Sequence, residues 1–244
     1  MNLILAQYKA SVLSLSRNPG YFIGSMVFPA VFFLFFVPSS APSTLEANFA
    51  MGSFMIFAMM GALFFGFAVG IANDRASAWA VYERTLPGSP YVRLVSRALN
   101  GFTFAGGAVV VMALVAHLTT PSHLPLAAWG RLALALVAGA IPISLLGFAI
   151  GYFASPKGAG TLAQLFYLPL SFVGGLWVPP QHLPEVVQKI SQFTPTRHWG
   201  ELVWQAVTGE AWRAQDFLSL AVFALLFGAI SLWGYRRDEG QRFR

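Results

Sequence analysis

Few side chains in this sequence have the type and spacing that enzymatic chemistry needs. The four histidines are scattered, and we interpret them as interfacial side chains and not as metal ligands. Lys157-Gly158 lacks both the preceding glycine loop and the following Ser or Thr of a phosphate-binding motif. There is no cysteine and no close pair of carboxylates. The sequence therefore predicts no enzymatic activity and no cofactor or metal site in this chain.

One group of residues has the spacing of a helical contact surface. Trp79, Tyr82 and Leu86 fall at i, i+3 and i+7, so they would form an apolar and aromatic stripe on one face of a helix. The charged residues beside the stripe are Arg75, Glu83 and Arg84. Such a stripe either docks a partner protein or lies on the membrane and on neighbouring helices. The spacing leaves both alternatives open.

A second group is polar and lies in a long apolar run. Gln164, Tyr167 and Ser171 fall at i, i+3 and i+7, so one face of a helix over 158–178 would be polar. The stripe suits either a substrate pathway or a contact between helices, and we cannot separate these two from the spacing. Glycines loosen the end of the run and a proline terminates it. The candidate gate or pathway residues are therefore these three and Gly174, Gly175 and Pro179.

The composition indicates that the elements holding these residues lie in a membrane. Hydrophobic residues make up 57% of the 244 and charged residues only 10%, whereas soluble domains carry about 25% charged residues. Six apolar stretches are long enough to cross about 30 Å of hydrocarbon, and they must be helices because lipid cannot satisfy backbone groups. They cover residues 21–37, 49–72, 99–118, 129–154, 158–178 and 217–235. We therefore predict a single all-α membrane domain over 1–244 with six transmembrane helices.

The distribution of basic residues predicts the orientation of these spans. Of the 15 Lys and Arg residues, all but four fall on the side that holds both termini, and the acidic residues divide almost evenly. An asymmetry confined to Lys and Arg marks the cytoplasmic side of a membrane protein and does not indicate nucleic-acid binding. We expect both termini to be cytoplasmic. The four basic residues on the outer side are Arg131, Lys189, Arg197 and Arg213.

Three segments outside the spans have distinct patterns. Residues 1–19 read as an interfacial amphipathic helix before the first span. Residues 73–98 form the longest cytoplasmic loop and hold the aromatic stripe. Residues 179–214 contain two short amphipathic helices separated by Thr194-Pro195, which suggests either a re-entrant hairpin in the outer leaflet or simple interfacial helices.

Glycines and acidic residues within the spans carry two further expectations. Gly66 and Gly70 in the second span, and Gly147 and Gly151 in the fourth, form G-x-x-x-G motifs, which we interpret as packing sites within the subunit. No acidic residue lies deep in any span. Carriers driven by protons or sodium usually place such residues along their path. The energy source for transport is therefore expected on another chain.

Together these residues resemble the type-2 ATP-binding-cassette permeases, a bacterial family that includes daunorubicin-resistance permeases and polysaccharide and lipid exporters. The resemblance covers nearly the whole chain. Arg-Asn-Pro at 17–19, with Pro29 in the first span, is similar to the family's entry. The most specific stretch is Leu-Pro-Leu-Ser-Phe-Val-Gly-Gly-Leu-Trp-Val-Pro at 168–179, followed by Leu183-Pro184 and by Phe-Thr-Pro at 193–195.

The resemblance implies a mechanism and a set of partners. Two six-span permeases would pair as a homodimer or heterodimer in the bacterial cell membrane, each on a cytoplasmic ATPase that binds ATP and Mg²⁺. The loop between the second and third spans would act as the coupling helix, and the ATPase contacts would be Arg75, Trp79, Tyr82, Glu83, Arg84 and Leu86. The family's Glu-Arg-Glu-x-Gly-Thr-Leu-Glu pattern is echoed here only by Glu83-Arg84-Thr85-Leu86, followed by Pro87.

The sequence therefore predicts the permease subunit of an ATP-driven exporter of a hydrophobic or amphiphilic substrate, such as a drug, a lipid or a glycan. A membrane scaffold or sensor subunit that does not transport is the first alternative. A secondary transporter is the second, and the lack of acidic residues deep in the spans argues against it.

Overall fold

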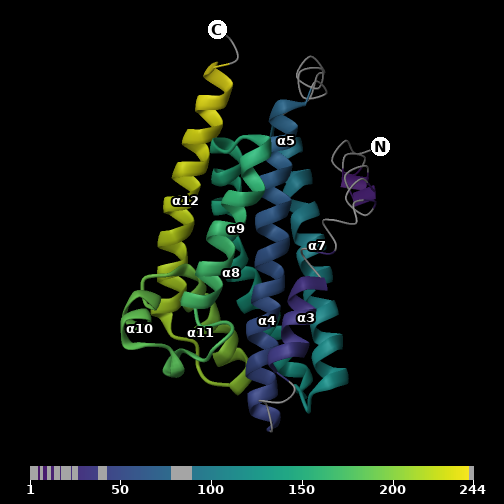
Figure 1. The fold of residues 1–244 in the computed structure, drawn as a ribbon, viewed down its shortest axis with the longest axis vertical. Helices are drawn as coiled ribbons and strands as arrows, with labels where there is room; N and C mark the ends of the chain where they lie inside the picture. The colour runs from purple at the N-terminus through teal and green to yellow at the C-terminus, as the bar shows by residue number, and fades with distance from the viewer. Residues whose placement is uncertain are drawn as a thin grey trace.

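All regular secondary structure in the described part of the chain is helical. The computed structural model describes residues 5, 8, 9, 12, 13, 17, 23, 27–37, 43–77 and 90–241, without the side chains of 90–93 and 239–241. Its long helices run side by side along one axis and form an elongated bundle (Figure 1). The prediction of an all-α membrane-type fold is thus confirmed for these residues.

One long helix forms the centre of the bundle. It consists of α4 (Thr44–Phe64), the π-helical turn η2 (Phe65–Val69) and α5 (Gly70–Ala76), which follow one another without a break. Ser43 starts it with a capping box, in which Ser43 Oγ accepts from Glu46 N and Glu46 Oε2 accepts from Ser43 N. Apolar residues occur on all sides of α4, so burial on all sides is favourable and the helix lies in the core.

The other long helices surround this central helix. The helix α7 (Pro90–Thr119) packs along α4, and α8 (Leu126–Phe153) packs along α4 and η2. The helix α9 (Pro156–Val173) contacts η2 and α4, whereas α12 (Ala214–Gln241) lies on the outer side of α8. A short helix, α3 (Phe28–Phe36), contacts α4 and α7.

Four of the six predicted spans are confirmed as helices long and apolar enough to cross a membrane. They are Thr44–Ala76, Leu94–Thr119, Leu126–Phe153 and Ala214–Asp238, and they match the second, third, fourth and sixth predicted spans. The predicted fifth span is shorter than expected, because α9 ends at Val173 and its 18 residues include Lys157, Gln164 and two prolines. The first predicted span is represented by α3, and residues 21, 22 and 24–26 lie outside the described residues.

Three short helices follow α9. They are the 3-10 helix η3 (Pro180–His182), α10 (Glu185–Ser191) and α11 (Pro195–Thr208). The two short helices predicted on either side of Thr194-Pro195 are therefore present, and Thr194 Oγ1 caps α11 by accepting from Arg197 N. The apolar side chains of α11, including Trp199 and Leu202, are buried against α4 and α8. Whether the pair enters a lipid leaflet stays a prediction.

Glycines of α8 bring it close to the central helix. A Cβ on Gly151 would lie 2.7 Å from Ile71 Cβ and 3.0 Å from Phe67 O, and one on Gly147 would lie 3.2 Å from Phe67 Cβ. The G-x-x-x-G motif of the fourth span is therefore a packing site within the subunit, as predicted, and it faces the π-helical turn. The motif of the second span differs, because a Cβ on Gly70 would meet nothing within 4 Å.

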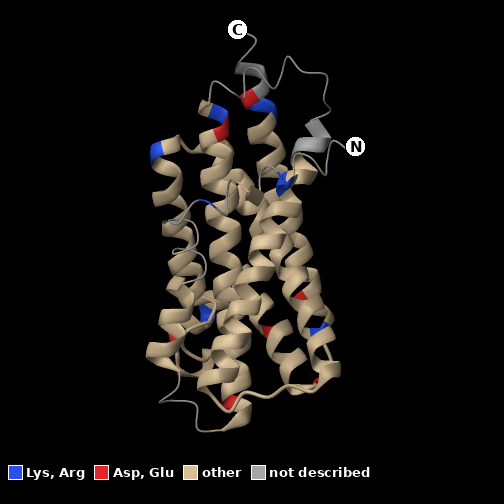
Figure 2. Ribbon diagram, turned by 90° about the vertical axis from the view of Figure 1, so that its right-hand side faces the viewer, with Lys and Arg blue, Asp and Glu red and all other residues tan. Residues whose placement is uncertain are grey.

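The two ends of the bundle differ in charge. Lys and Arg gather mainly at the end where α5 finishes and the C-terminus lies, while Asp and Glu occur at both ends (Figure 2). We call this the α5 end and the opposite one, which holds α10 and α11, the α10 end. Near the α5 end Tyr8 contacts α7, with 2.9 Å between Tyr8 Oη and Thr103 Oγ1. Most of 1–19 lies outside the described residues, so the interfacial helix predicted there stays a prediction.

Candidate functional site

The guanidinium of Arg75 joins three helices at the α5 end. Arg75 lies in the last turn of α5, and its Nε donates to Asp238 Oδ1 of α12 at 2.8 Å. Its Nη1 donates to Gly151 O at 3.0 Å and to Ala154 O at 3.3 Å, both at the end of α8. The last carbonyls of a helix lack intrahelical donors and carry partial negative charge, so a cation is favourable there. Arg75 thereby fixes α5 to α8 and α12.

The residue before Arg75 forms an ion pair with a different helix. Asp74 pairs with Arg97 of α7. These two residues lie near the two ends of the predicted coupling segment 73–98, so the ion pair closes the base of that segment. Ser77 then ends α5, with its N–H and Oγ both donating to Asp74 O. We call Asp74, Arg75, Arg97 and Asp238 the base clamp.

Only one of the six predicted ATPase contacts belongs to the described structure. Arg75 is half-buried and has the partners given above inside the chain. An ATPase contact stays a prediction for Arg75, and the structure adds an intramolecular role that the sequence analysis did not anticipate. The other five lie outside the described residues: Trp79, Tyr82, Glu83, Arg84 and Leu86.

The polar stripe of α9 contacts the central helix through Tyr167. Tyr167 Oη donates to Phe57 O at 3.1 Å, and the two rings stack with centroids 4.7 Å apart and planes 4° apart. Ser171 Oγ donates to Tyr167 O at 2.6 Å. Both side chains are buried, whereas Gln164 is half-buried. Tyr167 thus lies in a contact between α9 and α4, Ser171 bonds within α9, and the role of both in a pathway stays a prediction.

Gly174 brings the end of α9 against the start of α11. A Cβ on Gly174 would lie 2.4 Å from Thr196 Oγ1 and 2.8 Å from Leu170 O, so a side chain at this position would push the two helices apart. Thr196 Oγ1 donates to Leu170 O at 2.7 Å and joins the two helix ends directly. Gly175 then turns the chain with a φ of 80°, which favours glycine.

The last of the candidate gate residues lies at the turn after these glycines. Pro179 is exposed and immediately precedes η3. Ring atoms of the next proline, Pro180, occupy the space beside Gly175, where a Cβ would lie 2.7 Å from Pro180 Cγ. The structure thus brings Gly174, Gly175 and this turn together with α11, in a junction that includes Thr196. Thr196 was not predicted from the sequence, although its position just after Thr194-Pro195 could have indicated it.

A buried carboxylate near the α10 end was also not predicted from the sequence. Asp216 starts α12 and is 1% exposed. Its two oxygens lie 2.9 Å from His198 Nδ1 and 3.2 Å from Gln205 Nε2, both on α11. The seven-residue spacing of His198 and Gln205 on one helix face was the available signal. These bonds connect α11 to α12, and His198 Nε2 also lies 3.0 Å from Gln192 O.

Comparison with known proteins agrees with this architecture. A family model described as ABC-2 type transporter matches residues 2–208. A Bacillus subtilis (strain 168) protein, YvfS, which is named as a transport permease, is 25% identical over 244 residues, covering 98% of this chain and 99% of the relative. The family match spans the central helix, the base clamp apart from Asp238, and the junction of α9 with α11. The chain belongs to the ABC-2 type transporter family of membrane permeases.

Proposed function

We propose that this chain is the membrane-spanning permease subunit of an exporter that a separate cytoplasmic ATPase drives. The base clamp is the observation that carries the proposal. It lies where the predicted coupling segment leaves and re-enters the bundle, and it connects that segment to three different helices through Arg97, Gly151 and Asp238. A displacement of the segment would therefore reach α7, α8 and α12 together.

The continuity of the central helix supports the same mechanism. Because α4, η2 and α5 follow one another over Thr44–Ala76, a push on the α5 end acts along one helix that reaches the α10 end. The π-helical turn η2 lies against Gly147 and Gly151 of α8. Such turns interrupt regular helical hydrogen bonding and often occur at functional positions. We propose that α4 and α5 adjust relative to α8 at this turn during the transport cycle.

The charge distribution supports an orientation with the α5 end in the cytoplasm. Lys and Arg gather at this end, as expected for the cytoplasmic side of a bacterial membrane protein (Figure 2). The ATPase, with its ATP and Mg²⁺, would then bind residues 73–98 at this end, and both termini would be cytoplasmic. A second permease, identical or related, would complete the assembly, and a hydrophobic or amphiphilic substrate would leave toward the α10 end.

The test uses the purified permease with and without its ATPase. The permease alone is expected to hydrolyse no ATP, and the co-expressed complex in proteoliposomes is expected to hydrolyse ATP. Arg75→Ala is expected to reduce ATP-driven transport more than it reduces ATPase binding. Sustained ATP turnover by the highly purified single chain would refute the proposed division of labour between two subunits.

A further inference from the structure

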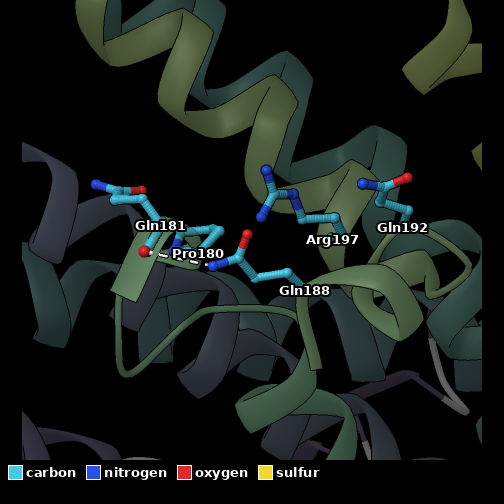
Figure 3. A pocket seen from close by; sticks show the side chains of 5 residues that line it. All are labelled: Pro180, Gln181, Gln188, Gln192 and Arg197. Atoms are coloured by element: carbon cyan, nitrogen blue, oxygen red, sulfur yellow. Dashed lines mark hydrogen bonds between the residues drawn. The ribbon is translucent and has the colours of Figure 1, made fainter. Parts of the chain in front are cut away.

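A polar pocket lies at the α10 end, between η3, α10 and the start of α11. Its volume is about 220 Å³, and its lining consists of Pro180, Gln181, Gln188, Gln192 and Arg197 (Figure 3). The Gln188 carboxamide faces the Arg197 guanidinium, and the side chains of Gln181 and Gln192 lie to either side of these two (Figure 3). None of the five lining residues is acidic. A drug-sized ligand needs about 300–1,000 Å³. The pocket therefore suits a small polar group and not a whole transported molecule.

Local hydrogen bonds fix the walls of this pocket. Gln188 Nε2 donates to Leu183 O at 2.8 Å and to Gln181 O at 3.4 Å, which holds α10 against the turn that contains η3. Thr194 Oγ1 accepts from Arg197 N and sets the first turn of α11. The guanidinium of Arg197 therefore projects into the pocket from a capped helix (Figure 3).

The guanidinium of Arg197 is held in place by partners that do not line the pocket. Its Nη2 donates to Glu201 one helical turn later, and its guanidinium carbon lies 5.6 Å from the centre of the Trp204 ring. Glu201 and Trp204 are not among the lining residues. A guanidinium has five N–H donors in a rigid fork, so a single carboxylate leaves donors that can face the pocket.

The surface beside the pocket indicates what kind of molecule would bring a polar group there. Three apolar side chains on the side of α10 opposite Gln188 and Gln192 are strongly exposed: Val186 at 68%, Ile190 at 53% and Phe193 at 79%. In a membrane permease such a ridge would face acyl chains. The helix α10 thus carries pocket residues on its polar side and exposed apolar residues on its other side, as a helix at a membrane surface does, where an amphiphile with an anionic head would be available. Arg matches phosphate by bidentate hydrogen bonding.

We propose that this pocket binds the phosphate-bearing headgroup of a membrane lipid, with Arg197 as the phosphate ligand and the Gln192 amide as a further hydrogen-bond donor. The lipid would hold the α10 and α11 pair at the membrane surface, beside the junction at Gly174 and Thr196. The proposal requires that the α10 end lies at a membrane surface, and it does not depend on ATP-driven coupling.

The test measures binding of short-chain phosphatidylglycerol to the purified permease in detergent by titration with native mass spectrometry. Arg197→Gln is expected to weaken binding about tenfold or more, because a charge-assisted pair is lost. Gln192→Leu removes a pocket amide and leaves Arg197 and its partners in place, so it is expected to weaken binding severalfold at an unchanged melting temperature. Arg213→Gln is the matched control: this arginine is also close to Glu201, at 3.9 Å, but is not a lining residue, and it should bind lipid like the wild type.

Three competitor arms identify the ligand. Diacylglycerol, which has no phosphate, should not compete. Glycerol phosphate and inorganic phosphate should compete only at far higher concentrations than the lipid. Full competition by either one at lipid-like concentrations would replace the lipid assignment with a free phosphate site. Unchanged lipid binding in both Arg197→Gln and Gln192→Leu would show that the lipid does not bind in this pocket. That result would leave the proposed ATPase coupling unaffected.

Discussion

Arg75 and Asp238 lie 163 residues apart in the sequence, and Arg75 Nε meets Asp238 Oδ1 at 2.8 Å. The preceding residue, Asp74, pairs with Arg97 on the opposite side of the central helix. Two consecutive side chains therefore tie the end of α5 to α7 on one side and to α12 on the other.

Replacing Arg75 tests whether this tie is structural, functional or both. Arg75→Ala removes the donor to Asp238 and to two carbonyls at the end of α8, so the free energy of unfolding should fall by about 1–3 kcal/mol. The loss should be smaller than for a fully buried pair, because the Arg75 side chain is 25% exposed. The measurement is the apparent melting temperature in detergent, beside the yield of ATPase that co-purifies.

The exposed Arg237 provides the control for this change. Arg237→Ala removes a cation from the same end of α12, and it should leave the melting temperature unchanged. Arg75→Lys should restore only part of the stability, since an ammonium cannot reach Asp238 and both carbonyls with the same fork. A loss of ATPase binding in Arg75→Ala without a lower melting temperature would instead make Arg75 a partner contact.

Replacing Tyr82 and Leu86 with Ala addresses the aromatic stripe. If the stripe docks the ATPase, the double substitution should weaken ATPase binding by about 2 kcal/mol or more, because buried aromatic anchors dominate interfaces. Transport should fall in parallel, while the melting temperature stays close to that of the wild type. Unchanged co-purification of the ATPase with a clearly lower melting temperature would show that the stripe packs on the membrane domain.

Some features of this molecule could be predicted from local sequence and others could not. The spans at α4, α7, α8 and α12 were predicted because a long apolar run has few alternatives in lipid. The start of α11 followed from Thr194-Pro195, a capping residue before a proline. The extent of α9 was wrong at its outer end, because Gly174 and Gly175 end the helix before the apolar run ends.

Contacts between residues far apart in the sequence could not be predicted from the sequence. The contact between Arg75 and Asp238 requires knowledge of how α5, α8 and α12 converge, and nothing local to either residue specifies it. The same holds for Asp216 at the start of α12. It is buried because His198 and Gln205 of α11 satisfy its oxygens. Composition specified the membrane setting, and only tertiary packing determined these polar contacts.

Gly174→Ala should disturb the junction of α9 and α11. The added Cβ would lie 2.4 Å from Thr196 Oγ1, so the helix ends must separate, which should cost about 1–3 kcal/mol of unfolding free energy. Gly106→Ala is the control, because a Cβ there meets nothing within 4 Å and the change should be neutral or slightly stabilising. Equal melting temperatures for the two variants would mean that the ends of α9 and α11 can separate without a loss of stability. The comparison is made by thermal unfolding of both purified proteins.

Cysteine labelling tests the orientation, since the native chain has no cysteine. A cysteine at position 157, at the α5 end, should react with an impermeant maleimide only after the cells are permeabilised. Cysteines at positions 46 and 189, at the α10 end, should react in intact cells. The reason is the excess of Lys and Arg at the α5 end. The opposite labelling pattern at 157 and 189 would invert the proposed topology.

Tyr167→Phe separates the two interpretations of the polar stripe on α9. The substitution keeps the ring that stacks on Phe57 and removes only the hydroxyl that donates to Phe57 O. If Tyr167 serves as a helix contact, the free energy of unfolding should fall by about 0.5–1.5 kcal/mol, and the relative transport of different substrates should stay the same. If it lines a pathway, substrate preference should change while stability hardly moves.

Gly61→Ala is the companion variant, because a Cβ there would lie 3.0 Å from Tyr167 Oη and would displace the ring from the opposite helix. Under the contact interpretation, both variants should lower the melting temperature, and the loss in the double variant should be smaller than the sum, since both disturb the same hydrogen bond. Fully additive losses, together with a changed substrate preference in Tyr167→Phe, would show that the hydroxyl acts on the transported molecule and not on α4.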